Sequence, residues 1–169
     1  SGSTGQAIRS TACRGGPRPQ RAILAPCQPV WVSEMGQFAT ADGLRLAYDV
    51  TGRGQPLLCL PGLTRNMEDF EPVLAGFAHR AQVIRMDFRG RGASDWGDPA
   101  TYQVPVEAGD VITLLDHLGL DRVTILGTSR GGLVALVLAA LARDRIAGVI
   151  FTDIGPEIMP EGLSYIMEY

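Results

Sequence analysis

The segment 127–131, with the sequence GTSRG, holds the residue in this chain whose type and setting best suit chemistry, a serine between two glycines. It matches the pattern G-x-S-x-G and lies between an apolar run at 123–126 and a small, apolar stretch at 131–142. A sharp turn from a strand into a helix strains its central residue, so small neighbours are needed at Gly127 and Gly131. Such a turn raises the hydroxyl of Ser129 at the positive end of the helix, where a developing oxyanion is stabilised. This context favours a nucleophilic serine over the alternative, a glycine-rich helix start with Ser129 in its first turn.

A serine nucleophile needs a general base, and histidine is the usual one. The chain has two histidines, His79 and His117, and both precede Ser129 near the ends of expected helices, where we interpret them as surface residues. Asp153 follows an expected strand and is a candidate for the catalytic acid; alternatively, it caps a turn at 153–155. All 15 basic residues are arginine, which excludes a P-loop lysine, a Schiff-base lysine and a Ser–Lys dyad. We expect no metal site and no cofactor.

Apolar patterns predict the elements that position these residues. Strands are predicted at 44–50, 57–60, 83–86, 123–126 and 148–151, and helices at 70–77, 111–118 and 131–142. Asn66 is the expected N-cap of the first helix, and Gly119 ends the second. Consecutive strand–helix–strand units imply an α/β fold with a mostly parallel, doubly wound sheet and helices on both faces. Ligands bind at the carboxyl ends of such strands, which directs attention to the loops at 61–66, 87–95, 127–132 and 152–157.

Three of these loops carry a family resemblance. The segments 58–66 (LCLPGLTRN), 86–95 (MDFRGRGASD) and 127–132 (GTSRGG) occur in the order found in the amino-terminal half of α/β-hydrolase fold proteins. The segment 151–157 (FTDIGPE) resembles the end of the sixth strand in a common bacterial branch of that family. The resemblance covers about residues 36–169. It implies a sheet of the α/β-hydrolase type.

The resemblance also implies roles for individual residues. Ser129 resembles the nucleophile, and the backbone N–H groups of Arg130 and Leu63 resemble the two donors of the oxyanion hole. Pro61 stands where the family usually has histidine, which matters little because backbone groups form the hole. Within the second loop, Asp87 and Arg89 are interpreted as a structural ion pair behind the site, in a turn that also contains Gly90, Gly92 and Ser94.

The family order of catalytic residues is Ser, then Asp or Glu, then His. No histidine follows Ser129, so we expect the chain to stop where a cap segment begins, at 156–169, before the last strands. The expected function is a serine hydrolase that cleaves small esters, lactones or related acyl or C–C bonds through an acyl-enzyme at Ser129. The truncated chain itself is expected to be inactive.

Other functions stay open at this stage. An acyltransferase or a cofactor-free perhydrolase would use the same triad, whereas a serine at position 129 argues against dehalogenase or epoxide hydrolase chemistry, which needs a carboxylate nucleophile. The chain is alternatively a non-catalytic remnant. It is also weighed as a nucleotide-binding module, because the segment 89–95 (RGRGASD) begins like G-x-G-x-x-G, but Asp95 replaces the third glycine and would repel a pyrophosphate.

Composition sets the remaining expectations. The chain has 169 residues, 46% of them hydrophobic, and a net charge of −3, which favours one globular domain and gives no case for nucleic-acid binding. Residues 1–34 lack an apolar period and are expected to be a disordered leader or upstream extension, so that the domain spans 35–169. The three unpaired cysteines and the absence of a secretory signal or membrane span predict a cytoplasmic protein whose partner is a small acyl substrate. The strand at 148–151 is expected to expose a hydrophobic edge.

Overall fold

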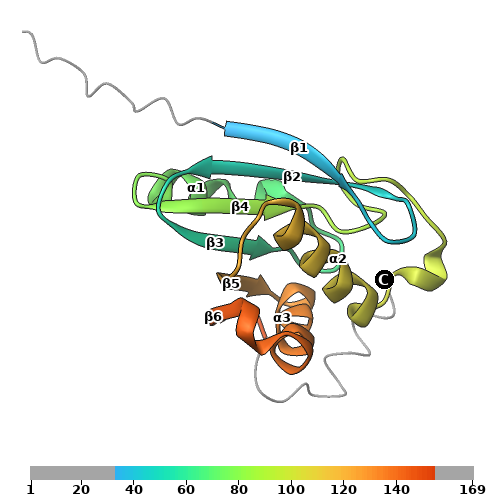
Figure 1. Ribbon diagram of the computed structural model, residues 1–169. Coiled ribbons are helices and arrows are strands. Elements are labelled where there is room, and N and C mark those ends of the chain that lie inside the picture. The colour runs from blue at the N-terminus through green and yellow to red at the C-terminus, as the bar shows by residue number, and fades with distance from the viewer. Residues whose placement is uncertain (1–32, 155–169) are drawn as a thin grey trace, which may run out of the picture.

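A single sheet forms the centre of the molecule. The computed structural model describes residues 33–154, and within them six strands lie in the order β1-β2-β4-β3-β5-β6 (Figure 1). Their bounds are β1 Ser33–Ala39, β2 Arg45–Gly52, β3 Gln55–Leu60, β4 Ala81–Met86, β5 Val123–Thr128 and β6 Ile146–Thr152. The four strands β3 to β6 run parallel, whereas β1 and β2 pair antiparallel at one side. The predicted mostly parallel sheet is confirmed.

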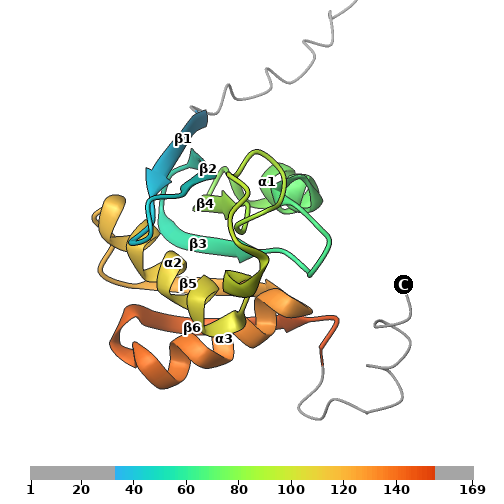
Figure 2. The same ribbon diagram turned by 90° about the vertical axis from the view of Figure 1, so that its right-hand side faces the viewer.

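Helices cover both faces of this sheet. They are α1 Glu71–Phe77, α2 Val104–His117 and α3 Arg130–Leu141, together with the short 3-10 helices η1 Met67–Phe70, η2 Pro99–Thr101 and η3 Arg143–Arg145. Figure 2 shows α1 on one side of the sheet and α2 on the other, and α3 packs against α2. Successive residues of a strand therefore face two different cores. Leu58 belongs to the core under α2 and α3, and Cys59 belongs to the smaller core with Phe70.

Three element boundaries differ from the sequence prediction. Asn66 does cap a helix, but the helix is η1, where its side chain accepts a hydrogen bond of 3.0 Å from the N–H of Glu68. The helix α2 begins at Val104, well before the apolar period becomes regular, because two buried acids interrupt that period. The strand β1 was not predicted at all. It begins at Ser33, so the last two residues of the expected leader at 1–34 belong to the sheet. Residues 1–32 and the expected cap segment at 156–169 lie outside the described residues.

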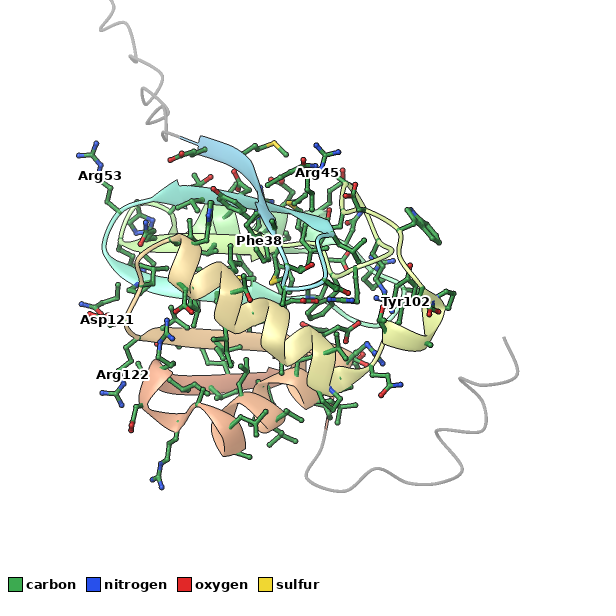
Figure 3. All side chains as sticks on the ribbon, turned by 45° about the vertical axis from the view of Figure 1, so that its right-hand side comes forward. Phe38, Arg45, Arg53, Tyr102, Asp121 and Arg122 are labelled. Atoms are coloured by element: carbon green, nitrogen blue, oxygen red, sulfur yellow. The ribbon has the colours of Figure 1, made fainter. Side chains whose placement is uncertain are left out.

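The parallel strands bring their following loops to one end of the sheet. Figure 3 places Tyr102, which precedes α2, at the opposite end of the molecule from Arg53, Asp121 and Arg122, which lie near the amino ends of strands. The loops after β3, β4, β5 and β6 therefore meet on the Tyr102 side.

The strand β6 forms one edge of the sheet in the part of the chain that the structure describes. Ile150 and Phe151 on this strand are 50% and 43% exposed, which agrees with the expected hydrophobic edge. No helix among residues 33–154 has the length and apolar character needed to cross a membrane.

Candidate active site

Ser129 alone makes the turn between β5 and α3. The strand β5 ends at Thr128 and α3 begins at Arg130, so the reversal falls on one residue with φ 49° and ψ −112°. A positive φ at a residue other than glycine is strained by about 1–3 kcal/mol and persists only where the surroundings enforce it. Here the N–H of Ser129 donates to the carbonyl of Thr152 at 3.0 Å, and its own carbonyl accepts from the N–H of Gly132 at 2.9 Å. The predicted sharp turn is confirmed.

The glycines around Ser129 are required by close backbone approach. A Cβ atom at Gly127 would lie 2.7 Å from the carbonyl oxygen of Gly131, and one at Gly131 would overlap the carbonyl oxygen of Leu60. Both contacts are closer than real Cβ atoms tolerate. The helix α3 can thus pack directly against β3 and β5 only because these positions lack side chains.

The loop after β3 lies against Ser129. Leu60, the last residue of β3, pairs with Gly127 in β5, and a Cβ atom at Gly62 would lie 3.8 Å from the Cβ of Ser129. The next residue in this loop is Leu63. On the other side, the N–H of Arg130 is the first of α3 and has no acceptor within the helix. The two residues whose N–H groups resemble oxyanion donors are therefore the next residues along the chain from Ser129 and from Gly62, which approach each other.

A cavity of about 380 Å³ opens beside the loop that holds Leu63. Leu63, Arg65, Arg91 and Tyr102 are among the residues that line it. Arg65 is held by two hydrogen bonds to the carboxylate of Asp69, from Nε at 2.6 Å and from Nη2 at 2.5 Å. The cavity lies between the β3 loop and the turn after β4, and it offers space for part of a small molecule beside Leu63.

The turn after β4 is built on Asp87, and the predicted ion pair between Asp87 and Arg89 is wrong. The carboxylate of Asp87 accepts the N–H groups of Met67 at 2.7 Å and of Ala93 at 2.9 Å. Arg89 turns toward α2 instead and pairs with Asp110 at 2.7 Å. The two residues differ because the short Asp87 side chain satisfies nearby backbone groups, whereas the long Arg89 side chain reaches another element. Both nevertheless support the turn, as the resemblance implied.

The same turn offers no cradle for a nucleotide phosphate. The N–H of Ala93 is already donated to Asp87, and a Cβ atom at Gly92, where φ is 53°, would overlap the Asp87 carboxylate. A phosphate-binding loop needs free N–H groups and no carboxylate beside them. This geometry disfavours the nucleotide-binding alternative.

The two histidines lie away from Ser129. His117 is the last residue of α2, and its Nε2 lies 3.2 Å from the hydroxyl of Tyr48, while His79 follows α1. Because these helices connect the carboxyl end of one parallel strand to the amino end of the next, their last residues lie at the end of the sheet opposite Ser129. This placement agrees with the interpretation of both histidines as surface residues.

Asp153 follows β6 directly and lies at the same end of the sheet as Ser129. It is exposed and has φ 55°. Its role as the catalytic acid stays a prediction, and the alternative turn at 153–155 extends outside the described residues.

The sequence prediction missed Glu107, a fully buried carboxylate next to this site. Its Oε2 accepts a hydrogen bond of 2.7 Å from Nε of Arg130, and its Oε1 accepts one of 3.2 Å from Nη1 of Arg91. A signal was available, because Glu107 lies four residues before Val111 and seven before Leu114, on the apolar face of α2. An acid on such a face indicates a buried pair.

Two further chemical features lie close to the sheet. Burial raises the pKa of the Cys59 thiol to about 12, so this group is neutral under ordinary conditions. Among residues 33–154, no group of three or more His, Cys, Asp or Glu side chains is arranged to hold a metal ion.

Comparison with known proteins identifies the family to which the chain belongs. The model of the alpha/beta hydrolase fold family matches residues 55–166, which include the loops after β3, β4 and β5. The chain belongs to the α/β-hydrolase fold family.

Named relatives of this α/β-hydrolase chain include two different kinds of hydrolase. The 3-hydroxybutyrate-oligomer hydrolase of Cupriavidus necator is 34% identical over 129 residues, which are 74% of this chain and 44% of the relative. The soluble epoxide hydrolase of a Corynebacterium species is 33% identical over 128 residues, which are 75% of this chain and 44% of the relative.

A solved structure shows the same fold. The crystal structure of an alpha/beta hydrolase from Novosphingobium aromaticivorans matches with a TM-score of 0.77 and 42% identity, covering 81% of this chain and 50% of that one. This α/β-hydrolase chain therefore spans about half the length of the relatives it matches. Together these matches show that the chain belongs to the alpha/beta hydrolase fold family.

Proposed function

We propose that the protein is a serine hydrolase that cleaves small esters, lactones or related acyl bonds through an acyl-enzyme at Ser129. The observation that carries this proposal is the single-residue turn at Ser129, which has a strained backbone and the β3 loop against its Cβ. Strain of this kind at a serine between a strand and a helix has no structural benefit of its own, and it is a feature of functional sites.

The proposed first step is attack of the Ser129 hydroxyl oxygen on the substrate carbonyl. The negative charge that develops on the carbonyl oxygen is stabilised by the N–H groups of Arg130 and Leu63 and by the positive end of α3. Collapse of this intermediate expels the alcohol and leaves an ester on Ser129. Water then hydrolyses that ester and releases the acid.

The serine proton must pass to a general base. Both histidines of the chain lie at the end of the sheet opposite Ser129. The chain spans about half the length of its relatives. We propose that the base comes from residues of the protein outside this chain, with Asp153 as a candidate for its acid partner. On this proposal the 169-residue chain alone has little activity.

The residue at position 129 separates the two chemistries named among the relatives. An ester or oligoester is cleaved through a serine, whereas the epoxide hydrolase branch uses a carboxylate at the turn. Serine at this position supports acyl chemistry, as in the relative named for 3-hydroxybutyrate oligomers. An acyl acceptor other than water would use the same intermediate, so acyl transfer remains an alternative outcome of this proposal.

The test is hydrolysis of short-chain aryl esters by the full-length protein. Replacement Ser129→Ala is expected to lower kcat by about 10³-fold or more, because the nucleophile is removed while the fold is kept. Thr113→Ala is the matched control, since this hydroxyl only bonds a carbonyl on the exposed face of α2, and it is expected to leave kcat unchanged. Equal turnover by Ser129→Ala and the unsubstituted protein would overturn the proposal.

A cytoplasmic location is also part of the proposal. It is supported by Cys59, which is buried and unpaired in the sheet. Fractionation of cells that express the full-length protein tests it, and recovery from the extracytoplasmic fraction would contradict it.

A further inference from the structure

Glu107 is a buried acid that the proposed reaction does not use. It lies in the first turn of α2, has no exposed surface, and both of its carboxylate oxygens accept hydrogen bonds from arginine. A buried carboxylate is costly to desolvate unless opposite charges and hydrogen bonds compensate it. Arg91 and Arg130 supply both, and these two arginines outnumber the single acid, which leaves one net positive charge in the group.

Each of the two arginines also reaches a residue placed at the oxyanion hole. Arg130 directly follows Ser129 and contributes its own N–H to the hole. Arg91 donates from Nε to the carbonyl oxygen of Leu63 and from Nη1 to the carbonyl of Arg89 at 3.0 Å. The side chains of Arg91, Glu107 and Arg130 therefore form a continuous bridge from one donor residue to the other.

The loop that carries Leu63 is also held by the N–H of Arg65, which donates to the carbonyl of Gly62 at 3.3 Å, and by the Arg65 side chain, which bonds Asp69. Leu63, Thr64 and Arg65 are all exposed, so apolar packing does not fix the orientation of their peptide groups. Oxyanion donors act only when they lie about 2.7–3.1 Å from the oxygen that becomes charged. A bond to the Leu63 carbonyl restricts the backbone on which that donor depends.

We propose that Glu107 is a positioning residue, which sets the spacing of the two oxyanion donors by holding Arg91 against the β3 loop and by tying Arg130, the first residue of α3, to α2. This inference rests on the proposed function. It deepens that function by assigning the support of the oxyanion hole to a residue of another helix, α2.

A second buried ion pair on α2 serves as a control, because it separates a loss of stability from a loss of donor positioning. Asp110 lies three residues further along α2, is also buried, and pairs with Arg89 at 2.7 Å, the same distance as between Glu107 and Arg130. The side chain of Arg89 is otherwise paired with Asp42 in the β1–β2 turn, so its hydrogen bonds go to Asp42 and Asp110. Asp110→Asn thus removes a comparable buried charge while it keeps all three side chains of the bridge, which meets Arg89 at its backbone carbonyl.

The experiment compares ester hydrolysis by the full-length protein and its variants at a temperature where each is fully folded. Glu107→Gln is expected to lower kcat by about tenfold to hundredfold with KM changed less than twofold, because oxyanion donors act mainly in the transition state. Asp110→Asn is expected to lower the thermal midpoint while leaving kcat unchanged. Arg91→Met, at a half-buried position, is expected to reproduce the fall in kcat and provides a second variant should Glu107→Gln not fold.

The outcomes are separable. If the unsubstituted protein shows Ser129-dependent turnover and both Glu107→Gln and Arg91→Met keep its kcat, the positioning role is overturned and the proposed function stands. A rise in kcat in Glu107→Gln would also overturn it, since it would show that net positive charge matters and geometry does not. Absence of any Ser129-dependent turnover would overturn both.

Discussion

At the scale of single residues, the strained turn at Ser129 requires that its neighbours Gly127 and Gly131 have no Cβ atom. Gly131→Ala is expected to lower the free energy of unfolding by about 1–3 kcal/mol and to lower the reactivity of Ser129, because the added Cβ would overlap the carbonyl oxygen of Leu60. Urea unfolding of the full-length protein measures the first effect and ester hydrolysis the second.

The control for this prediction is another helical glycine, Gly109 in α2. A Cβ atom there would meet nothing within 4 Å, so Gly109→Ala is expected to be neutral or to stabilise by up to about 1 kcal/mol. If both substitutions had the same effect, the close approach of α3 to β3 would not be what requires glycine at 131.

Cys59 offers a second prediction at this scale. The thiolate is the reactive form of cysteine, and burial raises the pKa of this thiol to about 12. The peptide that contains Cys59 is therefore expected to resist alkylation by iodoacetamide at pH 8 in the folded protein and to react rapidly in guanidinium chloride. Mass spectrometry of the digested protein measures both. Alkylation at equal rates in the two conditions would contradict the buried position in β3.

At the scale of elements, Arg89 ties the β1–β2 turn to α2. It pairs with Asp42 in that turn at 2.9 Å and with Asp110 in the helix. The hydrogen bond from Arg89 lowers the pKa of Asp42 to about 2, with a smaller contribution from Thr40.

This pair predicts how stability depends on pH. A carboxyl group whose pKa is lowered by folding stabilises the fold above its unfolded pKa, which is about 3.9, and loses that contribution as the pH falls toward 2. Asp42→Asn is expected to make the free energy of unfolding less dependent on pH between 4 and 2. Because the Asp42 side chain is 46% exposed, the difference is expected to shrink in 1 M salt. Parallel stability profiles for the two proteins across this pH range would argue against the pair.

The elements also show what the sequence could and could not predict. The parallel strands and the turn at Ser129 were predictable, because continuous apolar runs and glycines at fixed spacing are local signals. The pairing of Arg89 with Asp110 and the bridge through Glu107 were not predictable, because they depend on how α2 packs. Arg89 and Asp110 are 21 positions apart, and Glu107 and Arg130 are 23 positions apart. The strand β1 was missed because it has no long apolar pattern of its own. It is defined by its pairing with β2, in which Phe38 lies opposite Leu46.

At the scale of the whole molecule, the described part of the sheet ends in a strand with exposed apolar side chains. Ile150 and Phe151 in β6 lie at this edge, next to unpaired backbone groups that favour association with another strand. The 169-residue chain expressed alone is expected to elute from a sizing column as associated species, and Ile150→Lys is expected to shift it toward the monomer. A sharp monomer peak for the unsubstituted chain would contradict this expectation.

The central claim is that Ser129 is the nucleophile, and covalent labelling tests it most directly. A fluorophosphonate forms a stable bond to an activated serine oxygen with loss of fluoride, and peptide mapping by mass spectrometry then locates the modified residue. We expect the full-length protein to carry one adduct, on the peptide that contains Ser129, and to lose esterase activity in step with labelling. The Ser129→Ala variant is expected to remain unlabelled. An adduct on another residue, or full esterase activity after Ser129→Ala, would contradict the account.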